Sequence, residues 1–460
     1  MLSWKISAVA QAVGALNDLA DYADQRVTSV SFDTRKLQSN ALFVPLIADN
    51  DGHEYIDQAI EKGAVAAFWS RDLADAPEGI TLIEVEDTHE ALKAFAQSYL
   101  RAIQPKVVGI TGSNGKTTTK DMTASILETT YRTHKTDGNF NNDIGLPITI
   151  LQMPRDTEVL VLEMGMNHPH EISELSLLAE PDIAVITMVG ESHIEFFDSR
   201  DGIAAAKFEI VDGLKNEGDL IVNGDEEMLM KRLSDPHHFN QTTFGQKENN
   251  DIYPVFIESS MKKTIFSTNL DPKTAICLPL PGEYNVNNAL AALAVGLALD
   301  VSYKNIIKGL SEFQLTAHRL EWVLGFNQSQ LLNDAYNASP TSMKASIGSF
   351  LNSDNPSPKW LVLGEMGELG EESERYHREL SEVIDADQVD HVLLYGRLMK
   401  ELYDELKDDV DFQAVNLHYI ESDLDQLIDY LKDNIQHKDY LLFKSSFSTN
   451  LIQVVEELKI

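Results

Sequence analysis

The chain has 460 residues, a net charge of −36, 43% hydrophobic residues and one cysteine. This length is too great for a single core and predicts about three domains. The negative charge argues against broad nucleic-acid binding, and no apolar run is long enough to predict a membrane span or a signal peptide. Cys277 has no partner for an intramolecular disulfide, so we expect it to be a packed core thiol in a cytoplasmic protein. We also expect the protein to be a monomer.

The N-terminal residues 1–103 alternate short apolar runs with helical patterns, which predicts a small α/β domain. The runs that indicate strands are residues 27–32, 42–47, 64–69 and 81–85. Helical periodicity lies near residues 55–62 and 89–103. Gln104-Pro105 then has the composition of a linker into the next domain.

Residues 104–315 predict a central domain built on a mainly parallel sheet. Strands are indicated at residues 107–111, 158–164, 182–188 and 219–223. The helical stretches between them would cover both faces of the sheet. A β-rich stretch at 242–280 precedes a helix that starts near Asn285. In such sheets ligands bind beyond the carboxyl ends of the strands, so polar residues that follow the strands are the candidates for a site.

The turn after the first central strand has the pattern of a phosphate-binding P-loop. The predicted nucleotide-binding residues of this turn are Gly112, Ser113, Asn114, Gly115, Lys116, Thr117 and Thr118. Backbone N–H groups at a helix start attract anions, and glycine lets the backbone approach them closely. Lys116 would neutralise the terminal phosphates of a nucleoside triphosphate, and the Thr117 hydroxyl would bind Mg²⁺. The usual motif has glycine five positions before the Gly-Lys pair, where this chain has Ile110.

Polar residues farther along the chain extend this candidate site. Glu163 ends the second central strand, where a carboxylate is well placed to hold Mg²⁺. His193 follows the third strand, and its position favours a metal ligand and a solvated or packed histidine equally. Lys207 is typical of a solvated helix lysine, while Asn285 and Asn288 favour helix capping over contact with a base. These residues predict an ATP- and Mg²⁺-dependent α/β enzyme without identifying its substrate.

Residues 316–460 predict a third, Rossmann-like α/β domain. Its strands are indicated at residues 330–334, 360–363, 391–395 and 440–443. Acidic amphipathic helices lie between them, and a helix at 452–458 ends the pattern. The fold class predicted for the whole chain is therefore α/β in three domains.

Several blocks of the sequence together resemble the Mur ligase family, the ATP-dependent amide ligases of bacterial cell-wall precursor synthesis. These blocks are residues 109–117, 139–147, 163–166, 282–292, 317–321 and 333–340. The first is similar to that family's phosphate loop, which uses the shifted glycine spacing. The resemblance covers essentially the whole chain and implies a ligase with ATP and Mg²⁺ as cofactors, acting in peptidoglycan synthesis, cell shape and cell division.

Within the family, the chain resembles most the branch that joins D-alanyl-D-alanine to UDP-N-acetylmuramoyl-tripeptide. The blocks that carry this resemblance are residues 31–35, 42–46, 51–53 and 363–373. It implies that the tripeptide carboxylate becomes an acyl phosphate, which the dipeptide amine attacks to give the pentapeptide, ADP and phosphate. The alternatives are a sister ligase that adds a single amino acid or extends a folate or polymer tail, and a nucleotide-dependent binding protein without catalysis.

The resemblance also implies roles for individual residues around the nucleotide. The implied catalytic set is Lys116, Thr117, Glu163, His193 and Lys207. Within it, Thr117, Glu163 and His193 would bind metal, and Lys207 would join them if it is carbamylated. Asn285 and Asn288 would approach the adenine. Arg319 and Asp334 would reach the ATP from the third domain, which we expect to close on the central one.

The implied contacts to the other substrate come from three regions of the chain. They are Ser31 and Arg35 at the uridine diphosphate, Asn139 and Asn142 near the muramoyl peptide, and Tyr336 and Asn337 in the third domain. The chain also departs from the family near its last strand. Where the family often has Lys-Gly-Ser-Arg, this chain has Lys444-Ser445-Ser446-Phe447, so no arginine contact is carried over and Lys444 is the cation expected there.

Overall fold

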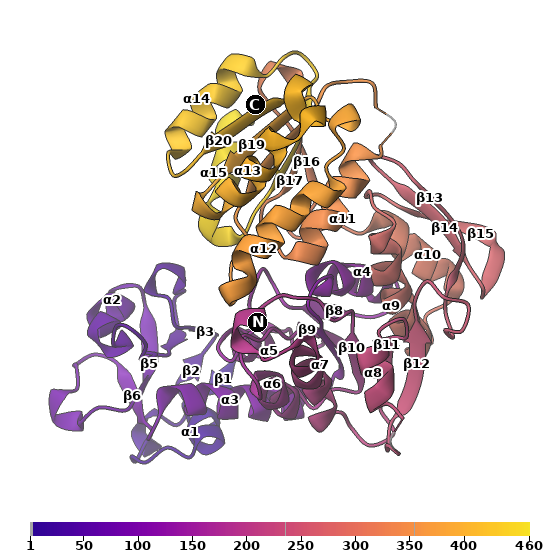
Figure 1. The fold of residues 1–460 in the computed structure, drawn as a ribbon. Helices are drawn as coiled ribbons and strands as arrows, with labels where there is room; N and C mark the ends of the chain where they lie inside the picture. Colours follow the sequence, from indigo (N-terminus) through magenta and orange to yellow (C-terminus); the bar gives the residue numbers. More distant parts are fainter. Residues whose placement is uncertain (1–2, 235, 354) are drawn as a thin grey trace.

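The computed structural model describes residues 3–234, 236–353 and 355–460. It confirms the predicted α/β class, because parallel sheets with flanking helices recur along the chain. In Figure 1 the N-terminal part, in indigo, lies beside the central part, and the C-terminal part, in yellow, stands above it. Over the portion of the chain described, no helix combines the length and the hydrophobicity needed to cross a membrane.

The N-terminal part is built on a parallel sheet of order β3-β4-β5-β6. Its strands are β3 (Ser29–Ser31), β4 (Ala41–Phe43), β5 (Ala64–Trp69) and β6 (Thr81–Glu84), with a short antiparallel pair of β1 (Trp4–Lys5) and β2 (Arg26–Val27). Its helices are α1 (Ile6–Val13), α2 (Ile56–Glu61) and α3 (Thr88–Ile103). Asp87 caps α3 by accepting hydrogen bonds from the backbone N–H groups of His89 and Glu90, and the helix ends at Gln104 in the left-handed conformation.

The central part has a parallel sheet of order β12-β11-β10-β7-β9-β8. Its strands are β7 (Lys106–Thr111), β8 (Thr133–Lys135), β9 (Val159–Glu163), β10 (Ile183–Ile186), β11 (Asp219–Asn223) and β12 (Asn240–Phe244). Its helices are α4 (Lys116–Glu128), α5 (Gly145–Gln152), α6 (Glu171–Ala179), α7 (Arg200–Phe208), α8 (Glu227–Arg232), α9 (Tyr284–Ala298) and α10 (Tyr303–Glu312). The middle strands are buried on both faces, as expected for a parallel sheet between helix layers.

Helix α4, which follows the phosphate loop, packs tightly between its neighbours. Met122, Ile126 and Leu127 on this helix are fully buried. A Cβ atom on Gly309 of α10 would lie only 2.5 Å from Ile126 Cα, so the two helices approach closely at a glycine. An antiparallel sheet of β13 (Pro254–Ser259), β14 (Thr264–Thr268) and β15 (Asp271–Leu278) lies beside α10.

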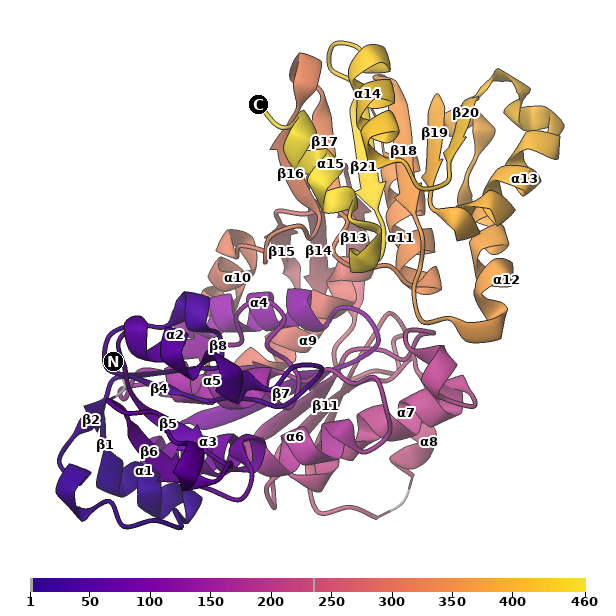
Figure 2. The ribbon, with the colours of Figure 1, turned by 90° about the vertical axis from the view of Figure 1, so that its left-hand side faces the viewer.

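The C-terminal part has a mixed sheet of order β16-β17-β21-β18-β19-β20, in which β16 pairs antiparallel with β17 and the other pairs are parallel. Its strands are β16 (Glu321–Leu324), β17 (Gln330–Asp334), β18 (Lys359–Gly364), β19 (His391–Tyr395), β20 (Asn416–Ile420) and β21 (Tyr440–Lys444). Its helices are α11 (Pro340–Leu351), α12 (Ser373–Arg378), α13 (Lys400–Asp408), α14 (Leu424–Asn434) and α15 (Leu451–Leu458). Figure 2 shows that α12 lies at the end of this part that faces the central one.

The prediction of a packed core thiol is wrong. Cys277 lies inside β15 as expected, yet its side chain is exposed, whereas Ile276 and Leu278 beside it are buried. Successive side chains of a strand point to opposite faces, and one face of this small sheet is open to solvent.

Several predicted strands are longer than the strands in the structure, and two of them have a clear local cause. The run at 42–47 ends as a strand at Phe43, shortly before Pro45, which cannot donate to a sheet. The run at 182–188 ends at Ile186, because Thr187 turns toward the phosphate loop and donates to the Asn114 carbonyl oxygen at 2.6 Å.

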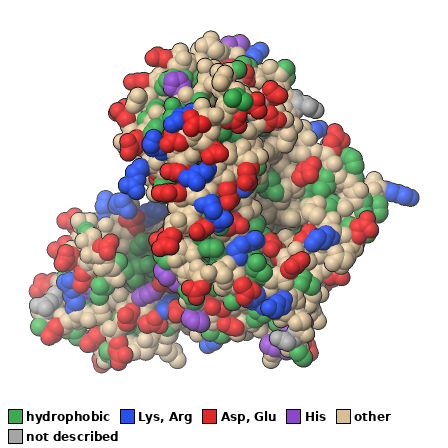
Figure 3. Space-filling view, viewed as in Figure 1, with side chains coloured by type: hydrophobic (Ala, Val, Ile, Leu, Met, Phe, Trp, Pro, Cys, Tyr) green, Lys and Arg blue, Asp and Glu red, His purple; other side chains and the backbone are tan. Residues whose placement is uncertain are grey.

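On the face shown in Figure 3, the acidic side chains do not gather in one place. Figure 3 shows them over the visible face of every part of the molecule, with Lys and Arg side chains interspersed. The visible face therefore shows no large patch of positive charge.

Candidate active site

The turn between β7 and α4 has the geometry of an anion cradle. Gly112 and Gly115 have φ angles of 150° and 83°, in the region that favours glycine. A Cβ atom on Gly112 would lie 1.8 Å from Thr187 Oγ1, and one on Gly115 would lie 2.2 Å from Asn288 Oδ1. Because α4 begins at Lys116, its unpaired N–H groups face this turn. Both glycines are therefore required by close packing as well as by backbone conformation.

Positive charge gathers beside this turn. Lys116 Nζ donates to the Gly112 carbonyl oxygen at 2.8 Å. Arg319 comes close from the C-terminal part, since its Nη2 donates to Thr117 Oγ1 at 3.3 Å. Burial lowers the pKa of Lys116 below its ordinary value, Glu163 opposes this shift, and Arg319 adds to it. Two cations held this close together favour the binding of an anion such as a triphosphate.

Glu163 ends β9 with an oxygen that lacks a partner. Its side chain is 2% exposed, and its Oε1 accepts a hydrogen bond from Asn141 Nδ2 at 2.9 Å. Its Oε2 is buried without a hydrogen-bond partner in the described parts of the chain. The Glu163 backbone N–H donates to Thr136 Oγ1 at 3.0 Å, which fixes the end of the strand. A buried carboxylate oxygen left alone costs free energy, so this position suits a cation.

Arg319 presents an unused donor at the same point. Its Cζ lies 4.3 Å from the centre of the Tyr336 ring, so the guanidinium stacks on an aromatic face. Its Nε is buried and finds no acceptor among residues 3–234, 236–353 and 355–460. A stacked guanidinium with a free N–H is well suited to a phosphate oxygen.

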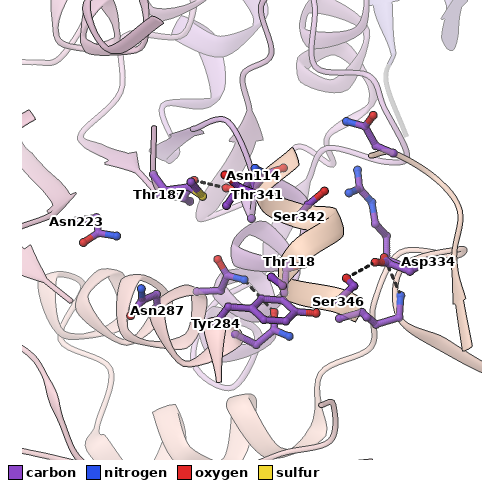
Figure 4. A pocket seen from close by; sticks show the side chains of 18 of the residues that line it. Asn114, Thr118, Thr187, Asn223, Tyr284, Asn287, Asp334, Thr341, Ser342 and Ser346 are labelled. Carbon is purple, nitrogen blue, oxygen red and sulfur yellow. Dashed lines mark hydrogen bonds between the residues drawn. The ribbon is translucent and has the colours of Figure 1, made fainter. Parts of the chain in front are cut away.

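A cavity opens beside the phosphate loop, between α9 and α11 (Figure 4). Tyr284 enters it from α9, and Ser346 from α11 donates to Asp334 Oδ2 at 2.9 Å. Burial, together with the charge of Asp334, raises the pKa of Tyr284 above its ordinary value, so the phenol keeps its proton. The predicted nucleotide-binding residues that line this cavity are Asn114, Gly115, Thr118, Asn285, Asn288, Arg319 and Asp334.

A second cavity adjoins the first, and Arg319 and Asn337 line both. The predicted metal and substrate residues along the second cavity are Lys116, Thr117, Asn139, Asn142, Glu163, His193 and Tyr336. The two spaces therefore meet where Arg319 faces the start of α4. This arrangement suits the transfer of a phosphoryl group from a nucleotide in one cavity to an acceptor in the other.

The C-terminal part reaches over the loops that follow β7 and β10. Its contacts are Ser339 Oγ with Asn114 Oδ1 at 3.1 Å, Thr341 Oγ1 with Glu191 Oε2 at 2.6 Å, and Glu368 with His193. These loops lie at the carboxyl ends of the central strands, where ligands bind in parallel sheets. The site is thus shared between two parts of the chain.

Comparison with known proteins shows the family to which the chain belongs. Residues 110–296 match the family model of the Mur ligase middle domain, and residues 318–447 match that of the Mur ligase glutamate ligase domain. The UDP-N-acetylmuramoyl-tripeptide--D-alanyl-D-alanine ligase of Bacillus subtilis (strain 168) is 41% identical over 459 residues, which cover 100% of this chain and 99% of that protein. The chain belongs to the Mur ligase family.

Other relatives and solved structures agree with this membership. The Escherichia coli (strain K12) ligase of the same description is 35% identical over 393 residues, covering 85% of this Mur ligase and 86% of that protein. A crystal structure of MurF from Acinetobacter baumannii matches with a TM-score of 0.85 and 30% identity, over 99% of this chain and 98% of that one. MurF from Thermotoga maritima in complex with ADP matches with a TM-score of 0.77 and 28% identity, over 94% and 97% of the two chains.

The structure corrects three expectations drawn from local sequence. Lys207 is not a solvated helix lysine, because its side chain is 1% exposed. Burial, and secondarily the charge of Lys116, lowers its pKa well below the ordinary value. Asn285 and Asn288 do not cap α9: Asn285 Nδ2 donates to the Pro281 carbonyl oxygen at 2.7 Å, and Asn288 faces the phosphate loop.

The predicted residues of the N-terminal part lie apart from both cavities of this Mur ligase. Ser31 Oγ closes a local turn with the backbone of Asp33, and Arg35 pairs with the Asp33 carboxylate at 2.9 Å while remaining exposed. Phe140 links this region to the central part. Its ring centre lies 6.5 Å from that of Phe32, and the ammonium of Lys36 lies 5.5 Å from it.

Sequence reasoning missed Asn141 and Tyr284 as residues that shape the site, whereas it did expect Lys444. Asn141 bonds Glu163, although Asn139 and Asn142 of the same block were the predicted ones. Lys444 is buried and donates to Asp334 Oδ2 at 2.6 Å, so the expected cation is engaged inside the C-terminal part. Tyr284 lines the nucleotide cavity. The quoted blocks at 139–147 and 282–292 contained Asn141 and Tyr284, yet neither side chain could be oriented from sequence.

The residues present fit Mg²⁺ rather than a metal held by protein ligands alone. Within the described ranges, no group of three or more His, Cys, Asp or Glu side chains could hold a metal ion. Mg²⁺ typically uses one or two carboxylates together with water and substrate phosphates. Glu163 with its unpartnered Oε2 and the buried Thr117 hydroxyl beside the phosphate loop provide such a partial site.

Proposed function

We propose that this chain joins D-alanyl-D-alanine to UDP-N-acetylmuramoyl-tripeptide through an acyl phosphate, with Mg²⁺ and with the residues assigned below. The chain is an ATP-dependent ligase of peptidoglycan precursor synthesis. Its products are UDP-N-acetylmuramoyl-pentapeptide, ADP and phosphate. The observation that carries the proposal is the pair of adjoining cavities that share Arg319 beside the phosphate loop, in a chain that matches the Bacillus subtilis ligase from end to end.

The chemistry explains why the two cavities meet. A carboxylate is a poor acyl donor, because oxide cannot leave. Transfer of the ATP γ-phosphoryl group to the tripeptide carboxylate makes an acyl phosphate, and the dipeptide amine then displaces phosphate to form the amide. Lys116 and Arg319 hold the phosphates and offset repulsion between two anionic reactants. The loop residues Gly112, Ser113, Asn114, Gly115 and Thr118 would place the phosphates. Asn285, Asn288 and Asp334, which line the first cavity, would place the nucleoside.

The metal-binding roles fall to residues along the second cavity. Thr117 and Glu163 would hold one Mg²⁺, and His193 would contribute to a second. When bound, Mg²⁺ neutralises phosphate charge and polarises the phosphoryl group. The unpartnered Glu163 Oε2 supports this assignment.

Lys207 is proposed to become a carbamate. Its lowered pKa favours the neutral amine, whose Nζ would attack CO₂ and lose a proton to form a carboxylate-like group. This change would turn a buried amine into a ligand for a hard cation. ¹³C NMR of the enzyme in ¹³C-bicarbonate tests the idea: we expect a carbamate resonance in the wild type and none in Lys207→Arg. A wild-type spectrum without that resonance would exclude the modification.

Substrate recognition is proposed to involve all three domains, at residues 1–103, 104–315 and 316–460. Arg35 is exposed and would leave its pair with Asp33 to reach a diphosphate, with Ser31 in the same loop, and Phe140 links that loop to the second cavity region. Asn139, Asn142, Tyr336 and Asn337 would line the path of the muramoyl peptide. The 316–460 domain would accept the dipeptide and close on ATP. We propose that the enzyme works as a monomer, which light scattering of the purified chain would test.

The deciding experiment is phosphate release by the purified enzyme with ATP, Mg²⁺ and UDP-N-acetylmuramoyl-tripeptide. We expect release to depend on D-alanyl-D-alanine and to fail with single amino acids. Release without the dipeptide, or with one amino acid in its place, would contradict the proposal and favour a sister ligase. With heavy oxygen in the tripeptide carboxylate, one label is expected in the released phosphate, and its absence would exclude the acyl phosphate.

A further inference from the structure

Glu368 of the C-terminal part contacts a residue proposed to bind metal. His193 lies in the loop after β10, lines the second cavity, and has a side chain that is 20% exposed. Its Nδ1 contacts Glu368 Oε2, which comes from the loop after β18. The two residues are far apart in sequence and belong to different parts of the molecule.

The loop that carries Glu368 is held from both sides. Within the C-terminal part, the Gly367 N–H donates to Ser446 Oγ at 2.8 Å. Toward the central part, the Glu195 N–H donates to the Glu368 carbonyl oxygen at 3.3 Å. Glu368 itself has a φ of 58°, a conformation that a non-glycine residue adopts only when its surroundings hold it. Its carboxylate is thus placed against His193 by the backbone on each side.

The contact between Glu368 and His193 could do more than hold the two parts of the molecule together, because carboxylates commonly orient metal-binding histidines. A histidine that binds metal usually donates its other ring N–H to a carboxylate, which fixes the ring and its tautomer. A proton on Nδ1, beside the Glu368 carboxylate, would leave the lone pair of His193 on Nε2, on the other side of the ring. We propose that Glu368 is a positioning residue that orients His193 for metal binding, so that cation affinity depends on where the C-terminal part sits. This inference rests on the metal role proposed above for His193.

The loop that carries Glu368 links the position of the C-terminal part to His193. Glu368 lies within the block at 363–373 that distinguishes the branch adding D-alanyl-D-alanine, and the same loop turns back to the end of β21 through Ser446. Movement of the C-terminal part would therefore shift the carboxylate behind His193. The affinity of the central part for a metal ion would therefore change when the C-terminal part moves.

Mn²⁺ binding measured by electron paramagnetic resonance, with a non-hydrolysable ATP analogue present, tests the role without any turnover. We expect Glu368→Ala to weaken Mn²⁺ binding about 10- to 100-fold, the usual effect of losing the carboxylate behind a histidine ligand. Glu368→Gln keeps an oxygen acceptor for the Nδ1 proton and is expected to stay close to wild type. Glu371→Ala removes an exposed carboxylate from the same loop and is the matched control, with unchanged affinity.

A double-variant cycle decides whether Glu368 acts through His193. If it does, Glu368→Ala adds no further loss to His193→Ala. Unchanged Mn²⁺ affinity in Glu368→Ala, an equal loss in Glu368→Gln, or additive losses in the double variant would each overturn the proposal. Failure of the metal role itself would show separately as wild-type Mn²⁺ affinity in His193→Ala, and failure of the ligase assignment as phosphate release without dipeptide.

Discussion

Several residues around the phosphate loop carry buried polar or charged groups that a bound ligand would stabilise. The pKa of Lys116 is lowered by burial, and within the described chain Glu163 Oε2 and Arg319 Nε have no hydrogen-bond partners. Such groups destabilise the protein without substrate, and they persist where function needs them. The cations Lys116 and Arg319 and the carboxylate Glu163 therefore lie where the two cavities meet, which is the position that a nucleotide and its metal ion would fill.

Removing the Lys116 ammonium tests the centre of this arrangement. We expect Lys116→Ala to lower kcat about 10²- to 10³-fold or more, because a group that stabilises transferred charge is lost. Steady-state phosphate release measures the effect, and the exposed Lys304→Ala is the control with wild-type turnover. Turnover by Lys116→Ala equal to that of the control would refute the assigned role.

Burial of Lys207 carries a stability cost with a defined pH dependence. Because its folded pKa lies well below the ordinary value of 10.5, the unfolded chain binds more protons at this residue between those two values. The free-energy cost of burying Lys207 is therefore greatest below its folded pKa, and it disappears as pH rises above 10.5. We expect Lys207→Met to raise Tm at pH 7 by about 2–4 °C, the shift that 1 kcal/mol produces in a domain of this size.

Calorimetry in CO₂-free buffer measures this effect, since a carbamate would alter the charge of Lys207. The increase in Tm of Lys207→Met over the wild type is expected to become smaller as pH approaches 10.5. The exposed Lys304→Met serves as the control, with little change in Tm at any pH. A lower Tm for Lys207→Met at pH 7 would contradict the expected cost.

Among the secondary-structure elements, α4 does more than present phosphate-binding N–H groups. Asp121 on this helix is 1% exposed and accepts hydrogen bonds from Lys135 Nζ at 2.7 Å and from the Thr316 N–H at 2.8 Å. Burial acts to raise the pKa of Asp121, but Lys120, Lys135 and the Thr316 N–H lower it below the ordinary value. Thr316 precedes Arg319 closely, so α4 also anchors the segment that brings this arginine to the site.

Neutralising this carboxylate is expected to weaken the anchor. Asp121→Asn leaves the buried Lys120 ammonium and the partly exposed Lys135 ammonium without their counter-charge, and breaking a buried pair typically costs about 3–5 kcal/mol. The folded pKa is lowered, so the stability that Asp121 contributes is full above pH 4–5 and is lost as pH falls through the folded pKa.

Thermal unfolding of wild type and Asp121→Asn from pH 7 to pH 3 checks both statements. The Tm difference is expected to be large at pH 7 and to narrow at the acid end. Asp24→Asn, which removes an exposed pair with Lys5, is the control with little effect. A pH-independent difference would show that the charge of Asp121 is not responsible.

At the scale of the whole molecule, the C-terminal part completes a site that the central part begins. Arg319, Asp334 and Glu368 come from beyond residue 315, while the phosphate loop, Glu163 and His193 come from before it. An acyl phosphate must be kept from water, so closure of one part on the other would protect it.

Small-angle X-ray scattering tests this closure in solution. We expect the radius of gyration to fall when an ATP analogue and UDP-N-acetylmuramoyl-tripeptide are added together, because both cavities are then filled. Arg319→Met, which lacks the cation that faces both cavities, is expected to compact less. An unchanged radius in the wild type would count against closure.

The sequence by itself determined the features that depend on neighbouring residues. The phosphate loop, the parallel strands and the α/β class follow from glycine placement and hydrophobic periodicity, which are local properties, and the structure has them near the predicted positions. The family blocks also contained many of the residues along both cavities. Only the tertiary structure decided which side chains meet. Burial of Lys207, exposure of Cys277, and the contacts of Asn141 with Glu163 and of Glu368 with His193 depend on how distant segments pack, and no local pattern encodes those distances.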